Sequence, residues 1–191
     1  MKGVLLMGYG SPETESDVTE YFTDIRGHVP GIAEIESLKE RYRKIGRSPL
    51  LEITLRQAKA LQALLGKDYA VYVGMKHWKP YLRDALEEME KDGIQEAVAI
   101  AMTPYFSSMS VGSYMKLVEG KTRIKINFVK SWCRNGFFLR AVEEKLNAIK
   151  DGSPVIFTAH SLPERILEIK DPYVDEIRET CAKIAAMAGP L

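Results

Sequence analysis

The sequence is poor in cysteine: it has only two, Cys133 and Cys181, among 191 residues. Two isolated thiols cannot build a zinc knuckle or a cysteine-ligated cluster from this chain alone. No apolar run approaches the roughly 18 residues of a membrane span, and the run at 4–7 is too short for a secretory signal. A net charge of +1 gives no basic footprint for nucleic acid. We therefore expect a cytoplasmic protein with no transmembrane segment and no nucleic-acid partner.

The hydrophobic pattern indicates alternating strands and helices. A chain of this length with 46% hydrophobic residues suits one globular domain, or one and a fraction, with a sizeable core. Apolar, β-branched runs predict strands at 3–8, 69–74, 97–102, 125–129 and 155–158. Apolar residues at helical spacing predict helices at 34–45, 53–65, 81–89, 137–149 and 175–187. This order predicts an α/β fold in which helices cover both faces of a doubly wound parallel sheet.

His160 occupies the most informative position in the sequence. It follows the predicted strand at 155–158, and the next residues, Ser161-Leu-Pro-Glu164, have the spacing of a helix capping box. His160 is therefore expected at the carboxyl end of a strand and just before a helix, where ligands bind in open α/β sheets. The positive end of the helix dipole disfavours imidazolium, so the neutral ring keeps a lone pair for a metal or a proton. The alternative is a purely structural role, which is the commoner one for a lone histidine.

Two further loops follow predicted strands. Tyr9 lies in a Gly-rich turn after the first strand, but Glu13 replaces the third glycine of a dinucleotide fingerprint, which argues against nucleotide binding. His77 follows the second strand and is expected at the same sheet edge, whereas His28 lies in a Gly/Pro loop and is expected to be solvated. Tyr9 alone is also compatible with an ordinary half-buried tyrosine.

The first third of the chain is locally basic. Arg26 ends a predicted helix, and Arg41 stands beside Tyr42 on the apolar stripe of the next one. Guanidinium groups at these points can hold carboxylates in bidentate pairs, although such a run is usually a solvated helix face. The segment at 103–115, predicted as a loop, combines aromatics, methionines and hydroxyls that can line an apolar cleft. Ordinary loop packing is the alternative for that segment.

These features together describe a cleft with apolar walls, arginines for carboxylates and a neutral histidine, which suits a planar tetrapyrrole with propionates. Several short motifs are distributed along the chain: Gly8-Tyr-Gly-Ser-Pro12, Tyr21-Phe-Thr-Asp-Ile-Arg26, the stretch from Arg41-Tyr42 to Ile45-Gly-Arg-Ser-Pro-Leu50, Gly74-Met-Lys-His77, Lys91-Asp-Gly93, Ser110-Val-Gly-Ser-Tyr114 and Thr158-Ala-His-Ser-Leu-Pro163. In these motifs the sequence resembles the ferrochelatase family, in order and over essentially its whole length.

The resemblance implies an enzyme that inserts ferrous iron into a porphyrin in haem synthesis, with Fe²⁺ as a substrate and no tightly bound cofactor. It implies two similar Rossmann-like domains with a cleft between them. His160 matches the family's active-site histidine, an iron ligand and acceptor of pyrrole protons. Tyr9 matches a tyrosine on the opposite, metal-facing side of the macrocycle in the branch that prefers coproporphyrin III to protoporphyrin IX. The substrate-contacting positions match Arg26, Arg41, Tyr42, Ser48 and Tyr114, and a pair beside the cleft matches Lys76 and His77.

The chain looks truncated at its C-terminus when it is set against the family. Four predicted strand–helix units can close a first domain at 1–132, which leaves only the beginning of a second at 133–191. The family's second essential acid, a glutamate opposite the histidine, belongs to the part that is absent. A lone strand with two helices cannot bury its apolar faces. We therefore expect the chain alone to self-associate and to be catalytically silent.

Two other functions stay open at this stage. The missing glutamate is compatible with a porphyrin- or haem-binding protein that performs no turnover. A short cobalt or nickel chelatase that works as a homodimer is the second alternative, although the arginines and the Ser-Pro-Leu segment favour ferrochelatase over it.

Overall fold

The computed structural model describes residues 1–149 and 151–188, so Lys150 and the last three residues of the predicted second domain, 189–191, lie outside the described residues. The contacts divide the chain into two compact units. Unit 1 comprises Met1–Met102 and Leu117–Phe128, and unit 2 comprises Thr103–Lys116 and Val129–Leu191.

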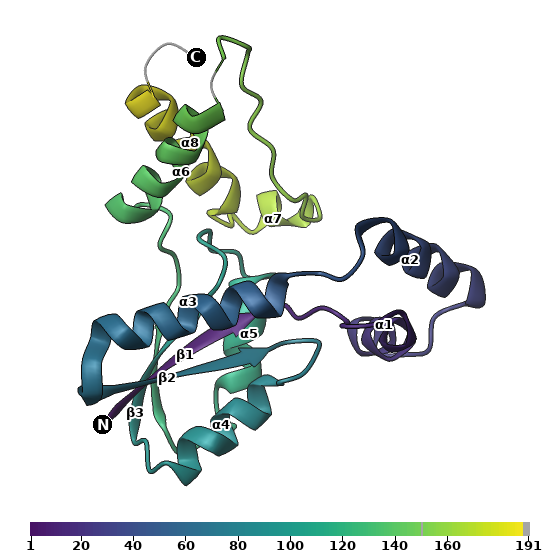
Figure 1. The fold of residues 1–191 in the computed structure, drawn as a ribbon, viewed down its shortest axis with the longest axis vertical. Coiled ribbons are helices and arrows are strands. Elements are labelled where there is room, and N and C mark those ends of the chain that lie inside the picture. Colours follow the sequence, from purple (N-terminus) through teal and green to yellow (C-terminus); the bar gives the residue numbers. More distant parts are fainter. Residues whose placement is uncertain (150, 189–191) are drawn as a thin grey trace. The chain divides into compact units, whose positions relative to one another are not determined.

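Unit 1 is built on a four-stranded sheet of order β2-β1-β3-β4. Its strands are β1 (Lys2–Gly8), β2 (Tyr69–Met75), β3 (Glu96–Ala101) and β4 (Lys125–Val129). β1 pairs in parallel with both β2 and β3 and is buried from its second residue to its last, as expected for a central parallel strand (Figure 1). The predicted α/β class and the first four predicted strands are confirmed.

Helices cover both faces of this sheet. The helices that lie wholly in unit 1 are α1 (Val18–Arg26), α2 (Ile32–Ile45), α3 (Leu50–Leu65) and α4 (Leu82–Lys91). On one face, Leu6 of β1 belongs to the same buried cluster as Ala58 of α3. On the other face, Gly74 of β2 lets α4 approach closely, since a Cβ there would lie 2.9 Å from the Cα of Leu82. α1 and α2 follow β1 in the chain and precede α3. They contact each other and lie at one end of the sheet (Figure 1).

Unit 2 has a core between two helices. α6 (Gly136–Ile149) and α8 (Tyr173–Ala188) bring Leu139, Leu146 and Ile184 together in one buried cluster. The short α7 (Arg165–Glu168) precedes α8. The predicted helices at 137–149 and 175–187 are confirmed and each is slightly longer than predicted.

The predicted strand at 155–158 is wrong. Residues 153–163 have no regular secondary structure, and Ile156 is 84% exposed. An isolated strand leaves its backbone groups without partners, and in the described part of the chain the four named strands form one sheet that does not include this segment. The predicted helix start at Ser161 is also wrong, because α7 begins at Arg165 with Glu164 as its N-cap. His160 therefore lies in an irregular segment, and the helix-dipole argument for its neutral ring loses its premise.

The segment at 103–115 is not entirely a loop, because α5 (Val111–Val118) begins within it. The signal for this helix is present in the sequence: Val111, Tyr114 and Val118 are buried and recur at helical spacing. Serines and Gly112, which favour turns, obscured it.

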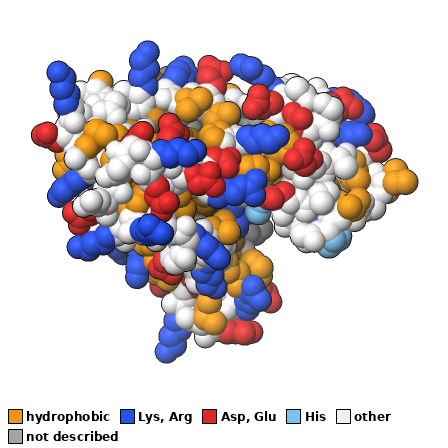
Figure 2. Space-filling view, turned by 90° about the horizontal axis from the view of Figure 1, so that it is seen from below, with side chains coloured by type: hydrophobic (Ala, Val, Ile, Leu, Met, Phe, Trp, Pro, Cys, Tyr) orange, Lys and Arg blue, Asp and Glu red, His pale blue; other side chains and the backbone are white. Residues whose placement is uncertain are grey.

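The surface carries charges of both signs. Figure 2 shows lysine and arginine side chains interspersed with acidic ones over the face seen there. Among the described residues, no helix is long and apolar enough to cross a membrane.

Candidate functional site

The carboxyl ends of β1 and β2 bring Tyr9 and His77 together. The Lys76 N–H donates to the Gly8 carbonyl and the His77 N–H to the Tyr9 carbonyl, each at 2.9 Å, so the pairing of the two strands continues past their ends. The ring centroids of Tyr9 and His77 are 4.7 Å apart. Both were predicted at this sheet edge, where open α/β sheets bind ligands.

Asp24 of α1 fixes the orientation of the His77 ring. Its Oδ2 lies 2.7 Å from the His77 Nδ1, and the His77 side chain is only 12% exposed. A carboxylate can only accept, so Nδ1 carries the proton and Nε2 keeps a lone pair. Sequence reasoning missed Asp24. No local pattern in the sequence marks it, because its partner His77 lies 53 positions away along the chain.

The environment of Tyr9 and His77 favours the neutral forms of both side chains. Burial lowers the pKa of His77, and Lys76 lowers it further, against the opposing effect of Asp24. Burial also lowers the pKa of Lys76, whose Nζ lies 5.9 Å from the centroid of the Tyr9 ring. Burial raises the pKa of the Tyr9 phenol, with Tyr42 and Asp24 adding to the shift. Tyr9 is therefore a neutral phenol and His77 a neutral imidazole near pH 7.

Tyr42 joins the turn that follows β1. Its hydroxyl lies 3.4 Å from the Ser11 Oγ, and its ring meets the edge of Tyr21 at a centroid distance of 6.4 Å. Tyr21 in turn donates to the Gly10 carbonyl at 3.3 Å. Tyr42 also borders a cavity of about 200 Å³, which is lined by Pro12, Glu13, Thr14, Glu15, Arg43, Gly46 and Arg47.

The other predicted substrate contacts of unit 1 are less enclosed. Arg26 is exposed, lies over the Phe22 ring at 5.1 Å and pairs weakly with Glu34 at 3.5 Å. Arg41 is exposed on α2. The Ser48 hydroxyl accepts the N–H of Leu50 at 3.3 Å, at the start of α3. An exposed ion pair between an arginine and a carboxylate contributes little to stability. Arg26 can therefore leave Glu34 and bind another carboxylate.

Unit 2 contains His160 and Tyr114. Tyr114 is buried on α5, with 6% exposed, whereas His160 is exposed and its carbonyl accepts the Tyr173 hydroxyl at 2.8 Å. His160 borders a largely apolar cavity of about 410 Å³, whose other lining residues are Ala159, Ser161, Leu162, Glu164, Ile166, Leu167, Tyr173, Val174, Ile177 and Arg178. His28 is exposed, as predicted. Within residues 1–149 and 151–188, no three histidine, cysteine or acidic side chains cluster as metal ligands would.

Comparison with known proteins gives consistent matches. The ferrochelatase family model matches residues 1–190. The chain is 39% identical to a coproporphyrin III ferrochelatase 1 of Bacillus cereus, over 96% of this chain and 65% of that protein. It is 40% identical to the coproporphyrin III ferrochelatase of Halalkalibacterium halodurans, over 98% of this chain and 66% of that protein. The corresponding protein of Geobacillus thermodenitrificans is 38% identical, over 98% and 65%. The chain thus spans slightly less than two thirds of the length of these curated relatives.

Proposed function

This chain belongs to the ferrochelatase family, and we propose that the gene product that contains it inserts ferrous iron into a porphyrin during haem synthesis. The observation that carries the proposal is the similarity of almost the whole chain to coproporphyrin III ferrochelatases. In this reaction Fe²⁺ and the porphyrin are substrates. Two pyrrole N–H protons must leave as the iron binds the macrocycle and sheds its water ligands.

His160 is proposed as the iron ligand and the acceptor of pyrrole protons. Imidazole is a borderline donor that suits Fe²⁺, and the same lone pair can take a proton. The apolar cavity beside His160 supports this role because it provides a surface for a planar, largely apolar macrocycle. A solvent-accessible ring also allows iron to reach the histidine.

Tyr9 is proposed to face the metal from the side of the macrocycle opposite His160. A neutral phenol offers an oxygen ligand without adding a fixed negative charge, and the raised pKa of Tyr9 keeps it in that form. Lys76 and His77, which pack against Tyr9, are proposed to tune this site. The His77 Nε2 lone pair provides a second proton acceptor beside it.

Arg26, Arg41, Tyr42, Ser48 and Tyr114 are proposed to bind the porphyrin, with the two arginines recognising its propionates. Four propionates need more cationic and hydroxyl partners than two, so we propose coproporphyrin III as the preferred substrate over protoporphyrin IX. Initial rates with both porphyrins under identical conditions test this choice. A clear preference for protoporphyrin IX would contradict it.

We propose further that residues 1–132 form the first domain of the protein and 133–191 the start of a second. The separation of the contacts into two units supports two domains, although residues 103–116 and 129–132 fall in unit 2 and not in the proposed first domain. The expected self-association and inactivity of the chain by itself stay predictions. So do the cytoplasmic location and the absence of a tightly bound cofactor.

The decisive experiment replaces His160 in the complete gene product. We expect His160→Ala to abolish iron insertion while the porphyrin still binds, because the change removes the proposed iron ligand and leaves the apolar side chains that line the rest of the cavity. His28→Ala is the matched control, since His28 is exposed in the loop between α1 and α2, and it should retain the parent rate. Near-normal turnover in His160→Ala would remove the core of the proposal.

Porphyrin fluorescence followed over time distinguishes iron insertion from the main alternative function, porphyrin binding without turnover. A porphyrin-binding protein without turnover would give a stoichiometric, saturating loss of porphyrin fluorescence with Fe²⁺, whereas an enzyme gives a continuing loss. Faster insertion of Co²⁺ or Ni²⁺ than of Fe²⁺ would favour the homodimeric chelatase.

A further inference from the structure

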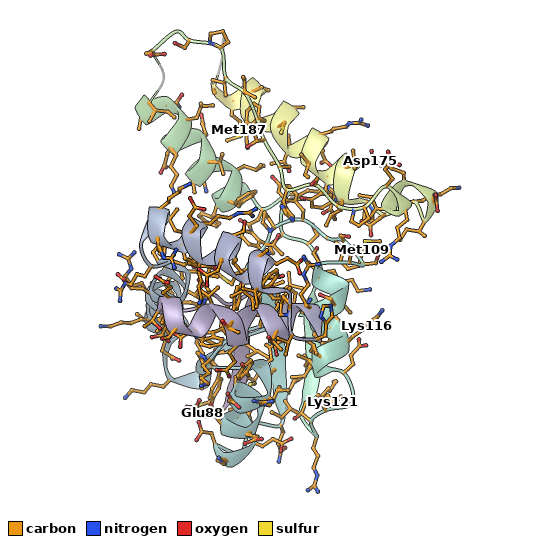
Figure 3. The ribbon with its side chains drawn as sticks, turned by 90° about the vertical axis from the view of Figure 1, so that its right-hand side faces the viewer. Glu88, Met109, Lys116, Lys121, Asp175 and Met187 are labelled. Atoms are coloured by element: carbon orange, nitrogen blue, oxygen red, sulfur yellow. The ribbon has the colours of Figure 1, made fainter. Side chains whose placement is uncertain are left out.

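A cluster of hydrogen bonds in unit 2 centres on Asp171. Its Oδ2 accepts the Ser108 N–H and the Ser108 hydroxyl, both at 2.8 Å, and the Ser107 hydroxyl at 3.1 Å. Its Oδ1 accepts the Tyr173 N–H at 3.2 Å. Ser107 is fully buried. One carboxylate thus ties the segment before α8 to the turn before α5, and Figure 3 labels Met109 in that turn and Asp175 near the start of α8.

Tyr173 extends this cluster to the proposed iron ligand. Its hydroxyl donates to the carbonyl of His160 at 2.8 Å, and its ring meets the edge of Tyr105 at a centroid distance of 6.2 Å. The bond to His160 matters because residues 153–163 have no regular secondary structure to hold them. A backbone carbonyl anchored at His160 itself restrains the position of the imidazole.

The other end of the cluster reaches a proposed porphyrin contact. The Ser107 carbonyl accepts the N–H groups of Ser110 at 3.2 Å and Gly112 at 2.9 Å, where α5 begins. Tyr114 lies one turn further along α5. Hydrogen bonds, joined through the residues Tyr173, Asp171 and Ser107, therefore link the backbone of His160 to the start of the helix that carries Tyr114.

We propose that Asp171 and Tyr173 are positioning residues that hold the His160 segment in register with the Tyr114 helix. The proposal rests on the proposed function, because it assigns to these two residues the placement of the iron ligand relative to the bound porphyrin. In this role both residues act through the His160 segment. The Tyr173 ring also lines the apolar cavity beside His160, so the role assigned here belongs to its hydroxyl and not to its ring. Chemical steps require reacting atoms in near-attack geometry, and a ligand displaced by about 1 Å costs on the order of a hundredfold in rate.

The main test is Tyr173→Phe in the complete gene product. This change removes one hydroxyl and keeps the ring that packs on Tyr105. We expect kcat for iron insertion to fall about tenfold or more, while the Kd for the porphyrin stays unchanged. Amide hydrogen exchange in residues 155–163 should become faster, because the anchor of the segment is lost.

Asp171→Asn tests the other half of the cluster. An amide keeps the size of the side chain but replaces one acceptor oxygen by a donor, so it cannot accept all four hydrogen bonds. We expect faster exchange in both 106–112 and 155–163, together with a fall in kcat. Tyr72→Phe is the matched control, because the Tyr72 hydroxyl donates to Asp92 at 2.7 Å in unit 1. This control should leave exchange in 155–163 and kcat at the parent values.

The outcomes separate this proposal from the proposed function. A parent protein that fails to metallate porphyrin overturns the proposed function and with it the positioning role, whatever the exchange data show. An active parent whose Tyr173→Phe variant keeps its kcat overturns the positioning role alone. So does a variant that loses porphyrin affinity at constant kcat, since that result would make Tyr173 a binding residue.

Discussion

Glu176 is the most buried acidic side chain among the described residues of unit 2, and its replacement gives a sharp test of how that unit is held together. It is 5% exposed on α8. Its Oε2 accepts the Phe106 N–H at 2.7 Å and the Ser131 hydroxyl at 3.0 Å. Its Oε1 lies 3.8 Å from the Nη1 of Arg134. This one side chain joins α8 to two separate segments of unit 2.

The size of the effect of Glu176→Gln follows from these contacts. A glutamine can place its carbonyl oxygen where Oε2 lies, so both hydrogen bonds survive, but their acceptor is no longer charged. A hydrogen bond to a charged group contributes about 1.5–3 kcal/mol and a neutral one about 0.5–1.5 kcal/mol. The loss is therefore about 1 kcal/mol for each bond, or about 2 kcal/mol in all. The ion pair with the more exposed Arg134 adds little to this sum.

Native-state hydrogen exchange of the α8 amides measures this change directly. A loss of about 2 kcal/mol should speed exchange of the protected amides by about thirtyfold. Glu179→Gln, one turn further along α8, is the control, since Glu179 binds Arg134 and Lys183 at the surface. It should speed exchange far less. If Glu176→Gln exchanges like the parent, the charged acceptor does not stabilise unit 2 and this reasoning is refuted.

Three further predictions concern the same structure. Gly10→Ala should destabilise unit 1, because Gly10 has φ +92° and a Cβ there would lie 2.8 Å from the Trp78 backbone nitrogen; thermal unfolding that leaves Tm unchanged would contradict this. Arg26→Ala should raise KM more than it lowers kcat, because a contact with a remote carboxylate is largely uniform binding; steady-state kinetics with coproporphyrin III measure the split, and an equal fall in kcat and kcat/KM would count against it. Arg134 and Lys183 lower the pKa of Glu179 from 4.5 to about 2. The stability that this carboxylate contributes is therefore fully present above pH 4.5 and is lost as the pH falls toward 2. The difference in stability between the parent and Glu179→Gln should shrink over that interval, and a difference that grows with acidity would contradict the assignment.

The sequence predicted the elements whose signals are local. β1 is a continuous apolar run, and α3 and α8 carry apolar residues at helical spacing, so all three could be recognised without knowledge of their neighbours. Tyr9 and His77 could be placed together because the carboxyl ends of adjacent parallel strands meet at one sheet edge.

The sequence could not predict contacts between distant polar side chains. The pairs Asp24–His77 and Ser108–Asp171 join residues 53 and 63 positions apart, and no periodic pattern marks them. The strand predicted at 155–158 failed for a related reason. A β-branched run favours extended backbone, but a strand forms only where another strand accepts its hydrogen bonds, and local composition does not report whether one is present.

The segment at 155–158 leads to a last prediction, on self-association. It has the composition of a buried strand, yet Ile156 is 84% and Phe157 40% exposed. A second copy of the chain can supply both a strand that accepts its backbone hydrogen bonds and apolar side chains that bury these two residues.

We expect the 191-residue chain to be monomeric when dilute and to associate as its concentration rises, with amide hydrogen exchange at 155–158 slowing in parallel. Burying one isoleucine contributes about 1.5–3 kcal/mol, so Ile156→Ser should raise the dissociation constant by about tenfold or more. Leu64→Ser is the matched control, since Leu64 is 85% exposed on α3 and should leave association unchanged. A chain that stays monomeric at every concentration, or exchange at 155–158 that is slow even when dilute, would contradict this prediction.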